Sequence, residues 1–266
     1  MSDDNSIEES NSEIVFSGGT DIGKVRKQNE DSILLCGFEH SDVILLVVAD
    51  GVGGHDGGEV ASKLAVETMK ETVSNAVLQV NSGGGYFENW LSSTLQQAIE
   101  DANKQIIEQQ NQTQYSNMAT TVVALLLRGN EAALSHLGDS RCYRLSEQQL
   151  IQLTEDHTLL QKMLNEGRIT QHEFEKSPMH HMISQALGLI EHPVVIVEPV
   201  QVADNALLLL CSDGLNNCIS DDQIRKVLET DNPLSDMVDE LITRANDYGG
   251  VDNISVVLVK FAGLSG

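Results

Sequence analysis

Short runs of apolar, often β-branched residues recur along this chain and constrain its fold more than any other feature. They occupy residues 31–38, 42–50, 120–145, 192–200, 205–214 and 252–261, and Gly, Asn or Asp bounds them. Runs of this kind are typical of strands, and the most continuous of them predict strands buried on both faces. The sequence therefore predicts a core built mainly from β-sheets.

Helical spacing occurs between these runs. Apolar residues recur with helical periodicity over 60–77 and 87–106. Further along, Ser220 with Gln223 predicts a capping box, and Pro233 predicts the first turn of another helix. Because strands and helices come in blocks, the predicted class is α+β, with helices covering antiparallel sheets.

The net charge of the chain limits the classes of molecule that it can bind. The formal net charge is −24 over 266 residues, which repels nucleic-acid phosphates and anionic lipid surfaces. We therefore expect no nucleic-acid partner and no membrane association. A chain with this charge favours the binding of cations. With 41% hydrophobic residues, the chain is long enough to bury one large core or two small ones.

The first residues of the chain and its cysteines indicate the cellular compartment in which we expect the protein. Residues 1–13 are acidic where a secretory signal would be basic, and we interpret them as a disordered acidic leader. The four cysteines form no C-x-x-C pair, which favours reduced thiols in a cytoplasmic protein. No long apolar stripe is left over for an interface, so we expect a monomer.

The segment GGTDIGKV, residues 18–25, matches part of a phosphate-binding P-loop. Gly18, Gly23 and Lys24 have the required spacing, but Val25 replaces the hydroxyl that binds magnesium. A P-loop leads directly into a helix, whereas the following residues, through Asp31, have no apolar helical face. We favour a chance match in a glycine-containing turn, with a nucleotide-binding protein as the alternative.

A stronger pattern is the placement of acidic residues at strand ends. Asp50 and Asp213 each end an apolar run and precede Gly, Asp252 begins the last run, and Glu30 with Asp31 precedes an early one. Two like charges about 4 Å apart repel by about 4 kcal/mol at an effective dielectric near 20. If these ends converge, the carboxylates must take up protons or bind cations. Oxygen ligands alone favour Mg²⁺ or Mn²⁺ over Zn²⁺.

Six segments form an ordered series along the chain: residues 23–31, 48–62, 136–141, 153–170, 208–215 and 249–259. Together they resemble the motifs of the metal-dependent serine/threonine protein phosphatases, the PPM family, in its compact bacterial form. The resemblance implies a single catalytic domain over 14–262: a four-layer α-β-β-α sandwich with a two-metal site at one end and a mobile flap at about 157–189. It also implies hydrolysis of phosphoserine and phosphothreonine by a metal-activated water, without a phosphoenzyme.

The resemblance also implies metal-binding roles near the strand ends. Asp50 would bridge two core ions, with Glu30 and the Gly51 carbonyl completing one site. Asp213 and Asp252 would complete the other. A further residue, Asp139 in LGDSR, would hold a third, looser ion together with Asp213.

Two basic residues are candidates for binding the substrate phosphate or for proton transfer. The family pattern assigns Arg26 to the substrate phosphate, and a guanidinium fork suits two phosphoryl oxygens; a surface Arg beside Lys24 is the alternative. Many eukaryotic members carry His directly after the Asp-Gly of the metal motif, but this chain has Val52 there, and His55 matches the bacterial pattern. Two roles stay open for His55: a general acid, or a group that orients a metal-bound water.

The flap departs from the family. Where members often carry two Arg residues, this chain has HHMISQALG, with His180, His181, Ser184 and Gln185, which predicts an altered peptide preference. The expected substrate is the target of a serine/threonine kinase. A catalytically inactive phosphoprotein-binding or metal-sensing protein of the same fold is the alternative, although retention of all core ligands argues against it.

Overall fold

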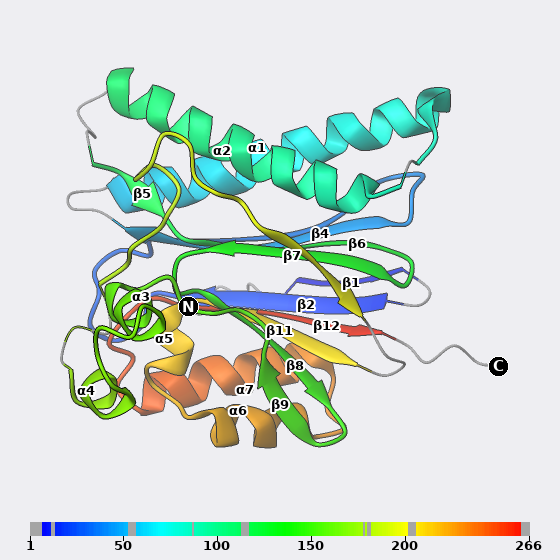
Figure 1. Ribbon diagram of the computed structural model, residues 1–266. Coiled ribbons are helices and arrows are strands. Elements are labelled where there is room, and N and C mark those ends of the chain that lie inside the picture. The colour runs from blue at the N-terminus through cyan, green and yellow to red at the C-terminus, as the bar shows by residue number, and fades with distance from the viewer. Residues whose placement is uncertain are drawn as a thin grey trace.

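The structure is a computed structural model in which two antiparallel sheets pack face to face between helices. It describes residues 7–11, 14–52, 57–86, 88–112, 117–177, 179, 182–201 and 206–261. Helices cover the outer face of each sheet, so the layers run helix, sheet, sheet, helix (Figure 1). The predicted four-layer α+β sandwich is confirmed.

The first sheet has six strands. In spatial order they are β1 (Ile7–Asn11), β2 (Ile14–Asp21), β12 (Ile254–Phe261), β11 (Leu207–Cys211), β8 (Arg141–Ser146) and β9 (Gln149–Gln152). The second sheet has the order β10 (Val197–Gln201), β7 (Glu131–Leu137), β6 (Val122–Arg128), β4 (Val43–Val52) and β3 (Asp31–Gly37), and β5 (Ala119–Thr120) pairs with the end of β4. Neighbouring strands pair antiparallel in both sheets.

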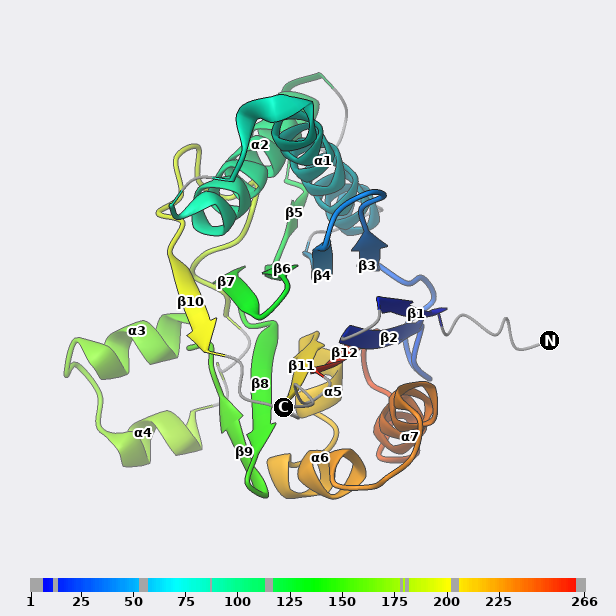
Figure 2. The same cartoon turned by 90° about the vertical axis from the view of Figure 1, so that its right-hand side faces the viewer.

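The helices of the described residues differ in what they cover. The long helices α1 (Gly57–Gln79) and α2 (Trp90–Gln112) cover the second sheet, and α6 (Asp221–Leu228) and α7 (Leu234–Asp247) cover the first. The short α5 (Asp213–Asn216) follows β11 directly. Figure 2 shows that α3 (Leu159–Asn165) and α4 (Gln171–Lys176) stand beside the sandwich and cover neither sheet. Among the described residues, no helix is both long and apolar enough to cross a membrane.

Strand β4 shows why its apolar run is continuous. Ile44, Leu46 and Val48 face the opposite sheet, whereas Leu45 and Val47 pack under α1 and α2. Both faces are buried, so neither can carry polar residues, and the run reads as uninterrupted in the sequence. The site-bearing end of this strand is therefore fixed by packing from two sides.

At the start of the chain, one prediction needs correction and another agrees with the structure. Residues 7–11 form strand β1 and pair with β2, so the predicted disordered leader is wrong there; the remaining residues before Ile14 lie outside the described residues. The sequence of β1, IEESN, has no alternation of apolar and polar residues, so no pattern predicted a strand there. The strand forms through backbone pairing with β2. The favoured interpretation of residues 18–25 as a chance match agrees with the structure, because Gly18 lies inside β2 and no helix follows Lys24 before β3.

Candidate functional site

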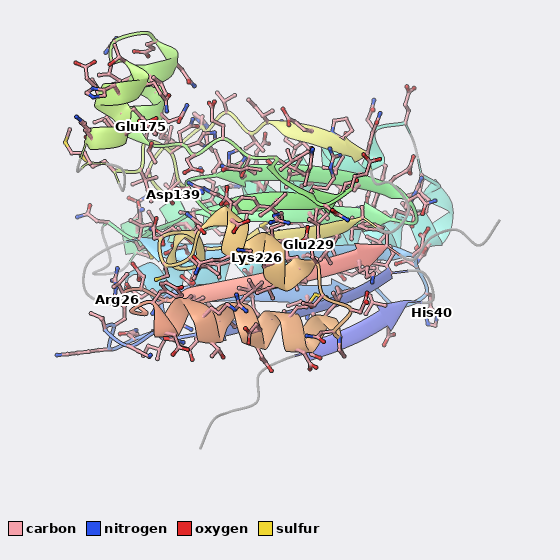
Figure 3. All side chains as sticks on the ribbon, turned by 90° about the horizontal axis from the view of Figure 1, so that it is seen from below. Arg26, His40, Asp139, Glu175, Lys226 and Glu229 are labelled. Carbon is pink, nitrogen blue, oxygen red and sulfur yellow. The ribbon has the colours of Figure 1, made fainter. Side chains whose placement is uncertain are left out.

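The acidic strand ends converge at one end of the sandwich. In the ladder between β3 and β4, Asp31 is directly opposite Asp50. Burial raises the pKa of Asp50 well above its usual range, and four neighbouring carboxylates raise it further, those of Asp31, Asp213, Asp139 and Asp252. Figure 3 shows Arg26 and Asp139 toward this end of the molecule and His40 at the other. The predicted convergence of the carboxylates is thus observed.

Glu30 and Gly51 are held against the start of α1. The Gly51 N–H donates to the Glu30 carbonyl over 3.1 Å, and the Ser62 hydroxyl donates to the same oxygen over 2.6 Å. A Cβ added to Gly51 would lie 2.3 Å from the Gly58 carbonyl oxygen, so only glycine lets the two backbones approach this closely. One added to Gly58 would lie 2.9 Å from Glu30 Oε1, which places the Glu30 carboxylate over the first turn of α1.

A network of hydroxyl groups joins Asp50 to the turn that carries Asp139. The Thr121 N–H donates to the Asp50 carbonyl over 2.8 Å, and the Asp50 N–H donates to the Thr121 hydroxyl over 3.1 Å. The same hydroxyl lies 2.7 Å from that of Ser140, next to Asp139. Burial and the nearby Asp213 raise the pKa of Asp139 to about 7. The two candidate ligands are therefore positioned by one buried network.

Asp31 is a site residue that the sequence analysis noted but gave no role. The hydroxyls of Ser212 and Ser255 donate to its Oδ2 over 2.8 and 2.7 Å, and its Oδ1 has no hydrogen-bond partner among the described residues. Burial raises the pKa of Asp31 to about 7, although the two hydroxyls act in the opposite direction. Asp31 is the first residue of β3, is buried, and pairs with Asp50 across the ladder. Knowledge of this strand pairing would have identified Asp31 as a site residue.

Asp213 follows β11 and Asp252 precedes β12, and these two strands are neighbours in the first sheet. Asp213 opens the short α5, where the Asn217 side chain donates to its Oδ2 over 3.0 Å. The Asn253 N–H donates to Asp252 Oδ1 over 2.8 Å just before β12. Burial, followed by repulsion from Asp252, raises the pKa of Asp213. Each carboxylate has local support, but the pair is electrostatically strained at neutral pH.

Arg26 lies at the mouth of this cluster. Its Nη2 donates to Asp252 Oδ2 over 2.7 Å, and its Nη1 lies 4.0 Å from Glu30 Oε2. The hydrogen bond to Asp252 raises the pKa of the guanidinium, and 47% of the side chain is exposed. Arg26 is therefore attached to the carboxylate centre while still facing solvent.

The donors fit a hard divalent cation by their chemistry. In the part of the chain that the structure describes, no three His, Cys, Asp or Glu side chains form a group that could hold a metal ion as they stand. Burial, followed by the charge of neighbouring carboxylates, raises the pKa values of Asp50 and Asp213, and Asp139 Oδ1 lacks a hydrogen-bond partner among these residues. An added cation would offset this repulsion and use the free oxygen lone pairs. The chemistry of these donors therefore fits Mg²⁺ or Mn²⁺.

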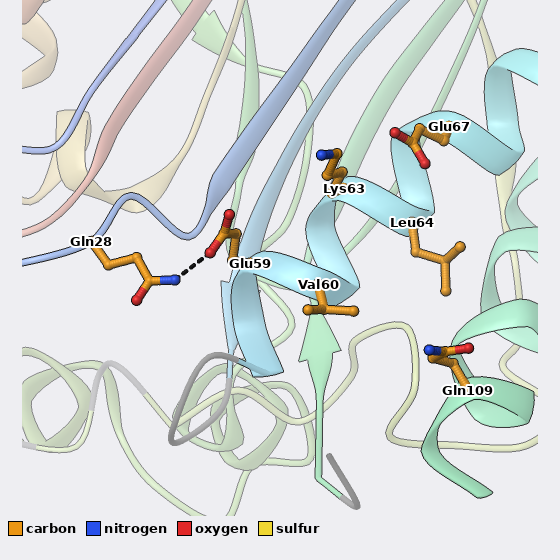
Figure 4. A pocket seen from close by; sticks show the side chains of 7 residues that line it. All are labelled: Gln28, Glu59, Val60, Lys63, Leu64, Glu67 and Gln109. Atoms are coloured by element: carbon orange, nitrogen blue, oxygen red, sulfur yellow. Dashed lines mark hydrogen bonds between the residues drawn. The ribbon is translucent and has the colours of Figure 1, made fainter. Parts of the chain in front are cut away.

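A cavity of about 580 Å³ lies beside the Glu30 side of the site. Gln28, on the loop that carries Arg26, donates to Glu59 of α1, and Val60, Lys63 and Leu64 line the wall along that helix (Figure 4). The cavity holds none of the predicted ligands. It extends the surface next to Arg26 along α1.

The structure describes only some of the predicted histidine and flap residues. His55, His180 and His181 lie outside the described residues. Gln185 is half-buried on the segment that returns from the flap. That segment is held to the flap base by the Ser184 N–H, which donates to the His157 carbonyl over 2.7 Å.

Comparison with known proteins identifies the family. Residues 19–259 match the model of the protein phosphatase 2C family. The chain belongs to this family. The resemblance inferred from the six motifs is therefore confirmed.

Several relatives match over nearly the whole chain. The serine/threonine phosphatase Stp of Listeria monocytogenes is 36% identical over 246 residues, which are 91% of this chain and 93% of the relative. The solved serine/threonine phosphatase of S. agalactiae is 31% identical, covers 94% of this chain and 99% of its own, and has a TM-score of 0.83. The catalytic domain of the phosphatase PstP, solved with two manganese ions, is 33% identical over 94% of this chain and 99% of its own, with a TM-score of 0.76.

Proposed function

We propose that this protein hydrolyses phosphoserine and phosphothreonine in proteins by a metal-dependent reaction without a phosphoenzyme. The observation that carries the proposal is the cluster of carboxylates at the strand ends, in which burial and like charge raise the pKa of Asp50 and Asp213. A fold that places such a cluster beside a half-exposed Arg can bind cations and a phosphoryl group together. The family match and the phosphatase names of the relatives support the same activity.

We assign two Mg²⁺ or Mn²⁺ ions to the cluster, supported by the two manganese ions in the related PstP structure. Asp50 would bridge them, Glu30 and the Gly51 carbonyl would complete one site, and Asp213 with Asp252 the other. Asp139 would hold a third, weaker ion with Asp213. When bound, such ions acidify a water and offset charge on the phosphoryl oxygens.

Arg26 is assigned to the substrate phosphate. Its ion pair with Asp252 keeps the guanidinium pointed at the carboxylate centre, and the exposed part of the fork leaves donors for phosphoryl oxygens. Arg26→Ala is expected to raise KM for a phosphopeptide more than it lowers kcat. Arg26→Lys keeps the charge but loses the fork, so partial recovery is expected.

His55 is kept as a candidate general acid for the leaving serine or threonine oxygen. A p-nitrophenolate leaving group needs no proton, whereas an alkoxide does. If His55 acts as an acid, His55→Ala will slow phosphopeptide hydrolysis much more than p-nitrophenyl phosphate hydrolysis. Equal slowing of both would favour the role in orienting a water.

We further propose that the substrate is the target of a serine/threonine kinase and that the protein acts as a monomer in the cytoplasm. The net charge of −24 supports a protein substrate over nucleic acid or an anionic membrane. Sedimentation of the purified protein tests the monomer, and a dimer at micromolar concentration would contradict it.

The direct test is phosphate release from a phosphothreonine peptide, with Mn²⁺ or with a chelator. We compare the wild type with Asp213→Asn, and with Asp231→Asn as a matched control on the exposed α6–α7 connection. Release that needs Mn²⁺, falls at least about 100-fold in Asp213→Asn and persists in the control supports the proposal. No release by the wild type despite Mn²⁺ binding would favour the inactive, phosphoprotein-binding alternative.

A further inference from the structure

A second cavity, of about 370 Å³, opens at the edge of the sandwich under the flap. We call it the edge groove. Its walls come from the end of β7, the segment after β9, the flap return and the residues leading into β10, and these elements lie together at one side of the molecule (Figure 2). Leu134 forms part of the core between the sheets, and the half-buried Leu153 packs against that core. The edge groove is therefore a place where the apolar interior of the sandwich reaches the surface.

The outer wall of the edge groove carries apolar residues where polar ones are expected. Val195 and Val197 pack inward on the core beneath α2, and Val194, Ile196 and Glu198 alternate with them and line the edge groove. Val194 is 74% exposed and Ile196 is 63% exposed. The Ser135 hydroxyl donates to the Ile196 carbonyl over 2.7 Å, which fixes the backbone and holds these side chains in water. An alternating outer face that is apolar indicates a surface covered by something else.

The edge groove is also negatively charged. Glu155 and Glu198 line it, and none of its described lining residues is Lys or Arg. His136 and His157 stack against each other with ring centroids 4.4 Å apart. Burial lowers the pKa of both imidazoles, so at neutral pH they do not offset the two carboxylates. A cationic occupant is therefore favoured.

One wall of the edge groove is joined directly to the candidate site. The His157 N–H donates to the Gly138 carbonyl over 2.9 Å, and the Gly138 N–H donates to His157 Nδ1 over 3.3 Å. Gly138 immediately precedes Asp139. The edge groove therefore lies next to the turn that carries Asp139.

We infer that the edge groove binds a segment of the substrate phosphoprotein in which an apolar side chain neighbours a Lys or Arg. This inference rests on the proposed phosphatase function and gives its substrate a chemical signature. The apolar side chain covers Val194 and Ile196, and the cation lies between Glu155 and Glu198. A second copy of this chain is a poor occupant because each copy carries a net charge of −24. Gln185, which also lines the edge groove, is neutral and leaves room for the cation.

The test uses phosphothreonine peptides that differ only in a pair of neighbouring residues: Leu-Arg, Ala-Arg, Leu-Gln or Ala-Gln, walked outward on both sides of the phosphothreonine. With Mn²⁺, we expect kcat/KM for the best Leu-Arg peptide to exceed that for Ala-Gln by about tenfold or more, mainly through KM. Equal kcat/KM across the set would overturn the inference.

Variants of the edge groove test whether its residues cause the preference for Leu-Arg peptides. Ile196→Ser should remove the advantage of Leu, whereas Glu198→Gln and Gln185→Arg should remove that of Arg, the last by placing a cation beside the carboxylates. Leu78→Ser and Glu71→Gln are matched controls at exposed positions on α1 and should keep both. Ile196→Ser, Glu198→Gln and the two α1 controls should hydrolyse p-nitrophenyl phosphate at the wild-type rate. A preference that survives in the edge-groove variants would contradict this assignment.

A binding measurement separates this inference from the proposed activity. Fluorescence anisotropy of labelled, unphosphorylated Leu-Arg and Ala-Gln peptides needs no turnover. Tighter binding of Leu-Arg, lost in Ile196→Ser, supports the edge groove even if no phosphate is released, and only the proposed function then fails. Equal binding of both peptides, with phosphate release intact, overturns the edge-groove assignment alone.

Discussion

The sheet side and the flap side of the candidate site are held in place by different means. Asp50 and Asp213 extend from β4 and β11, whose residues are buried on both faces. In the flap, α3 buries only Leu160 and α4 buries no residue. Hydrogen bonds also join the base of the flap to the sandwich. The contrast indicates that the fold places charged chemistry on its most rigid elements and leaves the surface next to the substrate free to vary.

Matched truncations test this contrast most strongly. Leu209 lies inside β11, four residues before Asp213 in the chain, and is fully buried. Leu209→Ala should lower the free energy of unfolding by about 3–5 kcal/mol because it leaves a cavity in a strand that cannot collapse. Leu160→Ala should lower it by about 1 kcal/mol or less, since the flap can open locally. Urea denaturation measures both, and equal losses would break the comparison.

An ion pair with two hydrogen bonds lies at the base of the flap. Arg141 donates from Nε and Nη2 to the two carboxylate oxygens of Asp156, over 2.8 and 2.7 Å. Arg141→Ala leaves a largely covered Asp156 without its partner, and should cost about 2 kcal/mol. Arg141→Lys keeps the charge without the fork and should lose less. Hydrogen exchange should show faster exchange in the flap for both variants; unchanged exchange would contradict a clasp at this point.

The buried carboxylates predict how stability depends on pH in a chelator. The pKa of Asp31 rises from 3.8 to about 7 on folding, so the folded protein binds the extra proton between these values. Through Asp31, the free energy of unfolding therefore falls as pH rises across this window, by at most about 1.4 kcal/mol per pH unit. Urea denaturation of wild type and Asp31→Asn isolates this slope. A wild type that gains more stability with pH than the variant would contradict it.

The two capping boxes give the smallest contrast. Ser220 caps α6, which buries three residues, and Thr170 caps α4, which buries none. Ser220→Ala should lower the free energy of unfolding by about 1 kcal/mol. Thr170→Ala should change it by less than about 0.5 kcal/mol, because melting α4 exposes no core. Thermal or urea unfolding distinguishes the two, and a larger loss for Thr170→Ala would place the flap within the cooperative unit.

Much of the fold could be predicted from local patterns. The strand runs are visible because burial on both faces excludes polar residues, as in β4. The Ser220–Gln223 capping box and the start of a helix at Pro233 were confirmed, because capping chemistry is local. β1 and β2 were missed, since one is a polar edge strand and Gly18 with Gly19 interrupts the apolar pattern of the other.

The site was predicted less completely than the fold. Acidic residues beside Gly at strand ends indicated Asp50, Asp213 and their neighbours because antiparallel pairing brings such ends together. The inward position of Asp31 depends on strand register, and the ion pair of Arg26 with Asp252 joins residues 226 positions apart. Contacts of this kind depend on the assembled sheets, and no local pattern contains them.

The most direct test of the central claim is the number of Mn²⁺ ions bound, measured by isothermal titration calorimetry on wild type and Asp50→Asn. The wild type should bind two ions tightly, and Asp50→Asn should lose tight binding of both because it removes the bridging carboxylate. Its circular dichroism and its stability in chelator should not fall, since Asp50 is repelled by its neighbours when no cation is bound. If Asp50→Asn binds two ions with wild-type affinity, the metal centre does not lie at these strand ends.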